Sequence, residues 1–326
     1  MSNTQLESKK DGFYQGDKSK ANGDDISSKI ITSESDVHKF LAEEELDYTV
    51  QKYQEVNPFT KEPLNSYGSY RTDNKHVFKT GLGNAYTPFQ NIDAFRSISE
   101  LAKNGEVSIA RGGVWNGGAE TFIQVDLNGG IKIGNKGDEV KQRVTFTNRH
   151  DGEGSARVFI TPFRPACRNQ LTLIRKIAKN AEQQLKIRHV ASGEALLQDL
   201  SSQWGIIDNA FQATSDHFNL LADTKITKET IAEVLNRIAP ITDKLSKRAR
   251  SVNEKKQLGI AQFVSNADDG FIAFDTAWNL INAVTRYTSH VQTGFSNKEK
   301  SLLVGSGRDS NYDALDIVTD VCGLTF

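Results

Sequence analysis

Positive charge is concentrated in one part of this chain, residues 141–188. The stretch holds 11 lysines and arginines against three acids, a net charge of +8, whereas the whole chain of 326 residues has a formal net charge of −1. Two strand-like runs, residues 143–147 and 156–161, flank a glycine-rich connection that contains Asp-Gly, which is typical of a β-hairpin. Apolar residues at helical spacing then predict a helix from Arg168 or Asn169 to Leu185. A cationic hairpin followed by a cationic helix favours a surface that binds a polyanion.

The cations of the predicted helix are spaced to share one side. Arg168, Arg175 and Lys179 are seven and four residues apart. Arginine suits phosphate because its planar group donates two parallel hydrogen bonds. We expect the first contacts with a nucleic-acid backbone from Arg164, Arg168, Arg175, Lys176 and Lys179, and further contacts from Lys141, Arg143, Arg149, Arg157 and Arg188. The alternative is the solvated helix face of an ordinary domain.

The rest of the chain predicts an α+β protein in three parts. Residues 1–30 are poor in aliphatic side chains, which predicts a disordered tail. Through Ser66 the chain carries 8 cations against 13 acids, so we describe this tail as acidic; it either shields the basic stretch or only adds solubility. Residues 31–200 are expected to form an antiparallel β-sheet with a packed long helix, and residues 201–326 a mainly helical region. Within the helical region, residues 244–256 are predicted to be a basic linker.

The chain offers no membrane span and no signal peptide, and its two cysteines, Cys167 and Cys322, suit a reducing compartment. We therefore expect a cytoplasmic protein.

Sequence signatures of catalysis are missing. There is no G-x-x-x-x-G-K-[ST] loop for nucleotide phosphates, and the six histidines show no metal-binding spacing. The acid pair Asp268-Asp269 and the run at residues 43–45 are interpreted as solvated charge rather than as a metal site. His150 and Asp151 fall on the predicted hairpin connection, where a role in the turn is expected. We expect a protein that is not an enzyme and uses no cofactor and no metal.

Several runs of sequence resemble the phage/plasmid-like protein family, a domain of unknown function found in phages and mobile plasmids. They are YTPFQNIDAF (86–95), GGVWNGGAETFIQVDL (112–127), residues 145–171, IRHVAS (187–192) and TAWNLINAVTRYTSH (276–290). The matching residues include Tyr86, Gln90, Asn91, Asn148, His150, Asp151, Gly152, Arg157, Arg164, Cys167, Asn169, Trp278, Tyr287 and His290. The resemblance covers the chain from about residue 34 to its end.

The order of strands and then a helix in that family is similar to the β-β-β-α core of single-strand annealing proteins such as Red-beta and RecT. This resemblance implies ATP-independent binding of single-stranded DNA and annealing of complementary strands in phage or plasmid homologous recombination. It also implies a homo-oligomer, a ring or a helical filament, in the cytoplasm of a bacterial host, with a host single-strand binding protein as a further partner. The alternative is a non-enzymatic regulator or host-defence-evasion factor that binds duplex DNA or another protein. A metal-dependent nuclease is a third interpretation, for which the sequence offers no acid cluster.

Overall fold

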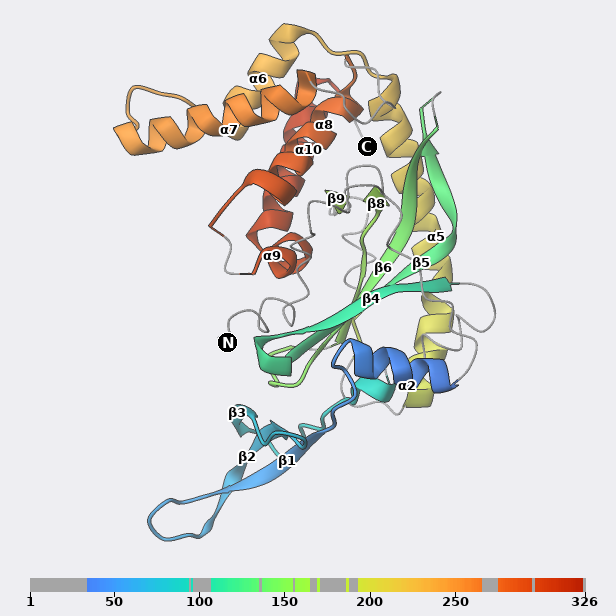
Figure 1. The fold of residues 1–326 in the computed structure, drawn as a ribbon, viewed down its shortest axis with the longest axis vertical. Helices are drawn as coiled ribbons and strands as arrows, with labels where there is room; N and C mark the ends of the chain where they lie inside the picture. Colours follow the sequence, from blue (N-terminus) through green and yellow to red (C-terminus); the bar gives the residue numbers. More distant parts are fainter. Residues whose placement is uncertain are drawn as a thin grey trace. The chain divides into compact units, whose positions relative to one another are not determined.

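The computed structural model describes residues 34–93, 95, 107–134, 137–154, 156–164, 169–170, 186–187, 193–265, 275–294 and 297–324. These residues form a mixed α+β fold with antiparallel sheets, which confirms the expected class (Figure 1). The chain divides into two compact units. Unit 1 draws its described residues from stretches 1–128, 143–159 and 180–207, and unit 2 from stretches 129–142, 160–179 and 208–326.

Unit 1 begins with a helix and a small sheet. Helix α2, Glu34–Glu43, buries Val37, Phe40 and Leu41, whose spacing places them on one face. Strands β1 (Val50–Val56), β2 (Pro63–Arg71) and β3 (Val77–Leu82) follow and form a three-stranded antiparallel sheet in the order β1-β2-β3. Figure 1 shows β1 and β2 as one long hairpin.

The predicted tail, residues 1–30, lies outside the described residues. The acidic excess counted through Ser66 comes mostly from α2 and the four residues after it, because residues 34–47 hold six acids and one lysine. Residues 1–30 themselves hold five acids and five lysines, so the description of this tail as acidic is wrong.

The larger sheet has seven strands, with the path β10-β7-β6-β5-β4. Its long strands confirm the predicted runs, and the short 3₁₀ turn η2, Asn116–Gly118, joins β4 to β5. The strands are β4 (Val107–Trp115), β5 (Glu120–Ile133), β6 (Asp138–Arg149), β7 (Ala156–Ile160), β8 (Phe163–Arg164), β9 (Asn169–Gln170) and β10 (Lys186–Ile187).

The predicted helix start at Arg168 or Asn169 is wrong at the residues that the structure describes. Asn169 and Gln170 form β9, in which they lie opposite Arg164 and Phe163 of β8. The backbone of these two residues therefore bonds across a short ladder, which a helix beginning at this point would break. The remainder of the predicted helix lies outside the described residues.

The C-terminal half is helical, as expected. The helices are α5 (Gly193–Asp223), α6 (Lys228–Ile238), α7 (Lys247–Ser265), α8 (Ala277–Arg286), the π-helix η4 (Tyr287–Val291), α9 (Lys298–Val304) and α10 (Ser306–Val321). Helix α6 is capped by Thr227, whose side chain accepts a hydrogen bond from Thr230 N–H. The predicted boundary at residue 200 falls inside α5, and the three-part division of the chain stays a prediction. No helix among the described residues is long and apolar enough to cross a membrane.

The predicted linker at residues 244–256 is wrong, because most of it forms the first half of α7. Polar side chains of this helix bind the backbone that follows α6: Asn253 donates to Pro240 O at 2.7 Å and Gln257 to Ala239 O at 2.8 Å. Further along, Ile260 and Val264 are buried. These contacts stabilise a helix whose sequence is too polar to indicate one.

A buried polar cluster lies in unit 2. Arg164 is 1% exposed, and its Nε donates to both carboxylate oxygens of Asp138, at 2.9 and 2.7 Å. The indole Nε1–H of Trp278 donates to the same carboxylate at 2.9 Å. Asp138 therefore binds a cation and an indole that lie 26 and 140 residues away in the sequence.

Replacing Asp138 is expected to destabilise unit 2. The Asp138→Ala change leaves the buried guanidinium of Arg164 without this carboxylate, which costs about 3–5 kcal/mol for a broken buried ion pair. Thermal and urea unfolding measure the loss, and Glu139→Ala, at the exposed neighbouring position of β6, is the control. Equal effects of the two substitutions would contradict this role of Asp138.

Candidate nucleic-acid interface

Two of the arginines expected to bind phosphate are buried in ion pairs. Arg143 is 1% exposed and binds Asp126 in a bidentate pair, with Nε to Oδ1 at 2.6 Å and Nη2 to Oδ2 at 3.0 Å. Arg164 is equally buried and binds Asp138. Neither guanidinium faces solvent in this conformation, so we leave both out of the interface proposed below.

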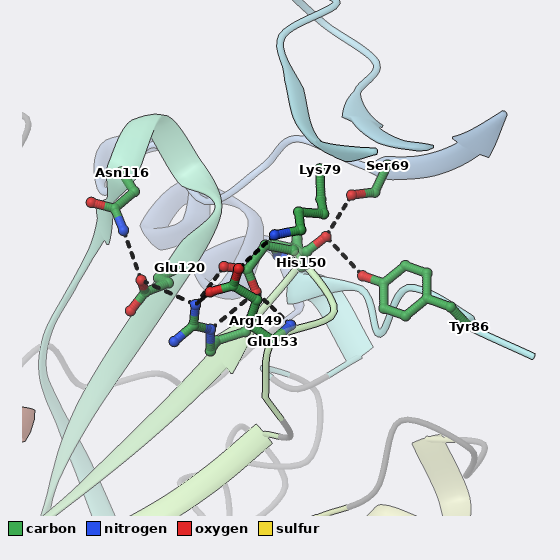
Figure 2. Close-up of polar contacts among 9 residues, drawn as sticks. Ser69, Lys79, Tyr86, Asn116, Glu120, Arg149, His150 and Glu153 are labelled. Atoms are coloured by element: carbon green, nitrogen blue, oxygen red, sulfur yellow. Dashed lines mark hydrogen bonds and ion pairs between the residues drawn. The ribbon is translucent and has the colours of Figure 1, made fainter. Parts of the chain in front are cut away.

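Arg149 lies at the end of β6 among three carboxylates. Its Nε donates to Asp151 Oδ1 at 3.0 Å and its Nη2 to Glu153 Oε2 at 3.1 Å, while Glu120 Oε1 is 3.8 Å from Nη2. Figure 2 shows Glu120 and Glu153 beside the guanidinium of Arg149. The hydrogen bond to Asp151 is the main cause that raises the pKa of Arg149. A cation bound in this way is already neutralised, so Arg149 is also left out.

Asp151 fixes the connection between β6 and β7. Its Oδ1 accepts a hydrogen bond from Glu153 N–H at 3.0 Å, which is the side-chain-to-backbone turn contact that the sequence predicted. Burial by itself would raise the pKa of Asp151, but the hydrogen bonds from Arg149 and from Glu153 N–H hold it below its usual range. At the same tip, Lys79 of β3 forms an ion pair with Glu153 at 2.6 Å.

His150 is fully buried and joins this connection to the three-stranded sheet. Its carbonyl oxygen accepts hydrogen bonds from Ser69 Oγ at 2.7 Å and from Tyr86 Oη at 2.8 Å (Figure 2). Its ring stacks on Phe78 of β3, with centroids 5.9 Å apart. Burial raises the pKa of Tyr86, so its hydroxyl keeps the proton that it donates.

The imidazole of His150 has a defined partner, Asn91, at 2.9 Å from Nε2. Asn91 Nδ2 donates to Leu46 O, which orients the amide so that Oδ1 accepts from the imidazole N–H. Nearby, Asn148 donates to Phe89 O, and Gln90 bonds both Val50 N–H and Val50 O. These are residues of the sequence motif, and they connect segments of unit 1 rather than line an open site.

Two other candidates lie on strands. Lys141 of β6 is half-buried opposite Phe163 of β8. Arg157 of β7 is exposed, and Lys186 of β10 lies opposite it in the ladder. The five remaining candidates, Arg168, Arg175, Lys176, Lys179 and Arg188, lie outside the described residues.

The sequence interpretation missed a row of cations on α7. Lys247, Arg248 and Lys255 are exposed, and among the described residues no carboxylate pairs with them. Arg248 and Lys255 are seven residues apart, so they lie on one side of the helix, away from buried Ile260 and Val264. We call these three cations the α7 row. The density of positive charge in residues 247–256 was visible in the sequence. Because this stretch was predicted to be a linker, its cations could not be assigned to one side of a helix.

The described residues hold no group of three or more histidine, cysteine, aspartate or glutamate side chains that could bind a metal ion.

Comparison with known proteins gives one result. The family described as "Domain of unknown function (DUF932)" matches residues 81–314, well over half of the chain. No curated protein and no solved structure matches. The match links the chain neither to phages nor to annealing proteins.

Stability is expected to fall in acid through Asp151. Because its folded pKa lies below the unfolded value, its contribution is present above about pH 4 and is lost as the pH falls through the folded pKa. The melting temperature of Asp151→Asn should therefore lie furthest below wild type near pH 7 and approach it near pH 2. Asp313→Asn, at an exposed position of α10, is the control and should track wild type throughout. A gap for Asp151→Asn that does not change with pH would contradict the assignment.

Proposed function

We propose that this chain, which belongs to the DUF932 family, binds single-stranded DNA through its phosphate backbone and promotes the annealing of complementary strands without ATP. The observation that carries the proposal is the α7 row, Lys247, Arg248 and Lys255. Unlike Arg143, Arg149 and Arg164, these cations are exposed and meet no carboxylate among the described residues.

The α7 row suits a phosphate backbone rather than a small anion. Seven residues of helix span about 10 Å, so Arg248 and Lys255 can contact different phosphates of one strand. Neutralising phosphates releases condensed counterions, which makes such binding steeply dependent on salt. A row of this kind contacts no base edges by itself, so binding should depend little on sequence.

Other cations support the same proposal from the sheet. Arg157 is exposed on β7, so it can contact a phosphate from the sheet. Arg168, Arg175, Lys176, Lys179 and Arg188 remain candidates from the sequence alone, and Lys141 remains one at the edge of the same stretch.

Annealing, oligomer formation and a place in phage or plasmid recombination rest on the resemblance to single-strand annealing proteins. The helix expected in such a core, from Arg168 or Asn169 to Leu185, lies outside the described residues apart from Asn169 and Gln170 of β9. The comparison therefore uses the order of strands β4 to β7 alone, and this is an argument by analogy of fold. We expect the activity in the cytoplasm of a bacterial host. The competing proposal, a regulator that binds duplex DNA or a protein, predicts no preference for single strands.

Reversing charge on the α7 row is expected to weaken binding. Arg248→Glu with Lys255→Glu should lower the affinity for a labelled oligo(dT) strand at least about tenfold at low salt. It should also reduce the slope of log Kd against log salt by the amount that about two lost phosphate contacts produce. Fluorescence anisotropy measures both quantities.

The control for this variant carries the same change in net charge at exposed positions elsewhere, Lys39→Glu on α2 with Lys228→Glu on α6. It should retain most of the affinity. Absence of binding by wild type at low salt, or equal losses for the two variants, would rule out the α7 row as the contact. Tighter binding to duplex than to single strands would favour the regulator.

Annealing is tested directly with two complementary oligonucleotides, one carrying a fluorophore and the other a quencher. Wild type should accelerate their pairing without nucleotide or magnesium, and the α7 variant should lose most of that acceleration. If wild type binds both strands yet leaves the pairing rate unchanged, annealing is excluded and only strand binding stands.

A further inference from the structure

One face of the three-stranded sheet carries two partly exposed tyrosines. In the β1–β2 ladder Tyr53 lies opposite Gly68 and Gln51 lies opposite Tyr70, so both tyrosines are on one face. Their ring centroids are 5.8 Å apart, with the planes at 68°. Val77 lies opposite Tyr70 on β3. We call these residues, Gln51, Tyr53, Tyr70 and Val77, the tyrosine face.

The other face of the same sheet is the one attached to the rest of unit 1. Ser69, which alternates with Gly68 and Tyr70, is fully buried and donates to His150 O. Lys79 lies opposite Ser69 and pairs with Glu153. The tyrosine face is therefore directed away from the connection between β6 and β7.

Gly68 allows the Tyr53 ring to lie flat on the strand. A Cβ at this position would be 2.4 Å from two atoms of the Tyr53 ring, so any other residue would displace the ring. One side of the ring covers the backbone of β2, which leaves the opposite side directed outward. The sequence thus presents a ring in a fixed orientation, with little rotamer freedom left to lose on binding.

Polar groups surround these rings, which suits a polar, hydrated ligand. Tyr70 donates its hydroxyl proton to Gln51 Oε1 at 2.9 Å, and Lys75 Nζ lies 5.5 Å from the centroid of the Tyr70 ring. Lys75 is exposed and pairs with no carboxylate among the described residues. Glu55 lies where the register of β1 against β2 shifts, and it accepts a hydrogen bond from Gly81 N–H.

We propose that the tyrosine face stacks the unpaired bases of a single strand and so distinguishes single-stranded from duplex DNA. This inference rests on the proposed function, to which it adds recognition of bases. Aromatic rings bind any base through its π-face, and in a duplex those faces are already covered by neighbouring base pairs. Single strands and duplexes both carry phosphates, so the rings, rather than attraction to phosphate, make the distinction. Lys75 beside the Tyr70 ring is placed to contact the phosphate that follows a stacked base.

A strand without bases separates stacking of bases from binding to the phosphate backbone, because an abasic oligonucleotide carries the same phosphates as oligo(dT). Wild type should bind oligo(dT) at least about fivefold more tightly than an abasic strand of equal length. Tyr53→Leu with Tyr70→Leu should lower the affinity for oligo(dT) to that for the abasic strand, whose affinity should not change. Tyr53→Phe with Tyr70→Phe keeps both rings and should keep the wild-type preference. Melting temperatures check that each variant folds.

The outcomes separate cleanly. Equal affinity of wild type for the two strands overturns stacking and leaves backbone binding in place, and this result needs no variant. If the leucine variant still binds oligo(dT) more tightly than the abasic strand by the wild-type factor, the assignment to Tyr53 and Tyr70 is overturned. The assignment is also overturned if the phenylalanine variant binds the two strands equally. If wild type binds neither strand, the proposed function itself has failed. The Arg248→Glu, Lys255→Glu variant should lower the affinity for oligo(dT) and for the abasic strand by the same factor.

Discussion

The buried hydrogen bond between His150 and Asn91 is the contact on which the organisation of unit 1 depends. It joins two segments that are 59 residues apart, and the carbonyl of the same histidine accepts from Ser69 and Tyr86. Without Asn91 a buried imidazole nitrogen would lose its hydrogen bond, and without Ser69 and Tyr86 the buried carbonyl would lose two. The motif that stands out in the sequence therefore mainly connects segments of unit 1. It fixes which face of the small sheet is covered by the rest of that unit.

Ion pairs reduce the number of cations in residues 141–188 that are available to bind a ligand. The net charge of residues 141–188 counts Arg143 and Arg164 as available, but their carboxylate partners, Asp126 and Asp138, precede the counted window. Arg149 is neutralised mainly from within it. Cations that are neighbours in the sequence are thus not all available at one surface. Within the part of the chain that the structure describes, cations that pair with no carboxylate gather on α7, where the count of charges is less conspicuous.

Periodicity alone sufficed for the hairpin strands β6 and β7 and for the helical C-terminal half, because in each the apolar spacing follows the local geometry. It failed at Asn169, where two residues pair with β8, and at α7, where buried apolar residues are few. The tyrosine face could not be predicted, since whether Tyr53 and Tyr70 share a side depends on the β1–β2 register. The partners of His150 come from β2 and from the run 86–95, which lie 59 to 81 residues away in the sequence, and no local pattern indicates them.

The two units are interleaved along the chain, and this constrains how the protein can be made. Unit 2 begins at residue 129, yet unit 1 needs residues up to 207. A ribosome therefore releases two segments of unit 2 before unit 1 has its last segment, so these segments must wait for residues 208–326 while unit 1 folds. For the same reason, a fragment cut at any single point from residue 129 to residue 207 would remove part of one unit while carrying an orphaned piece of the other.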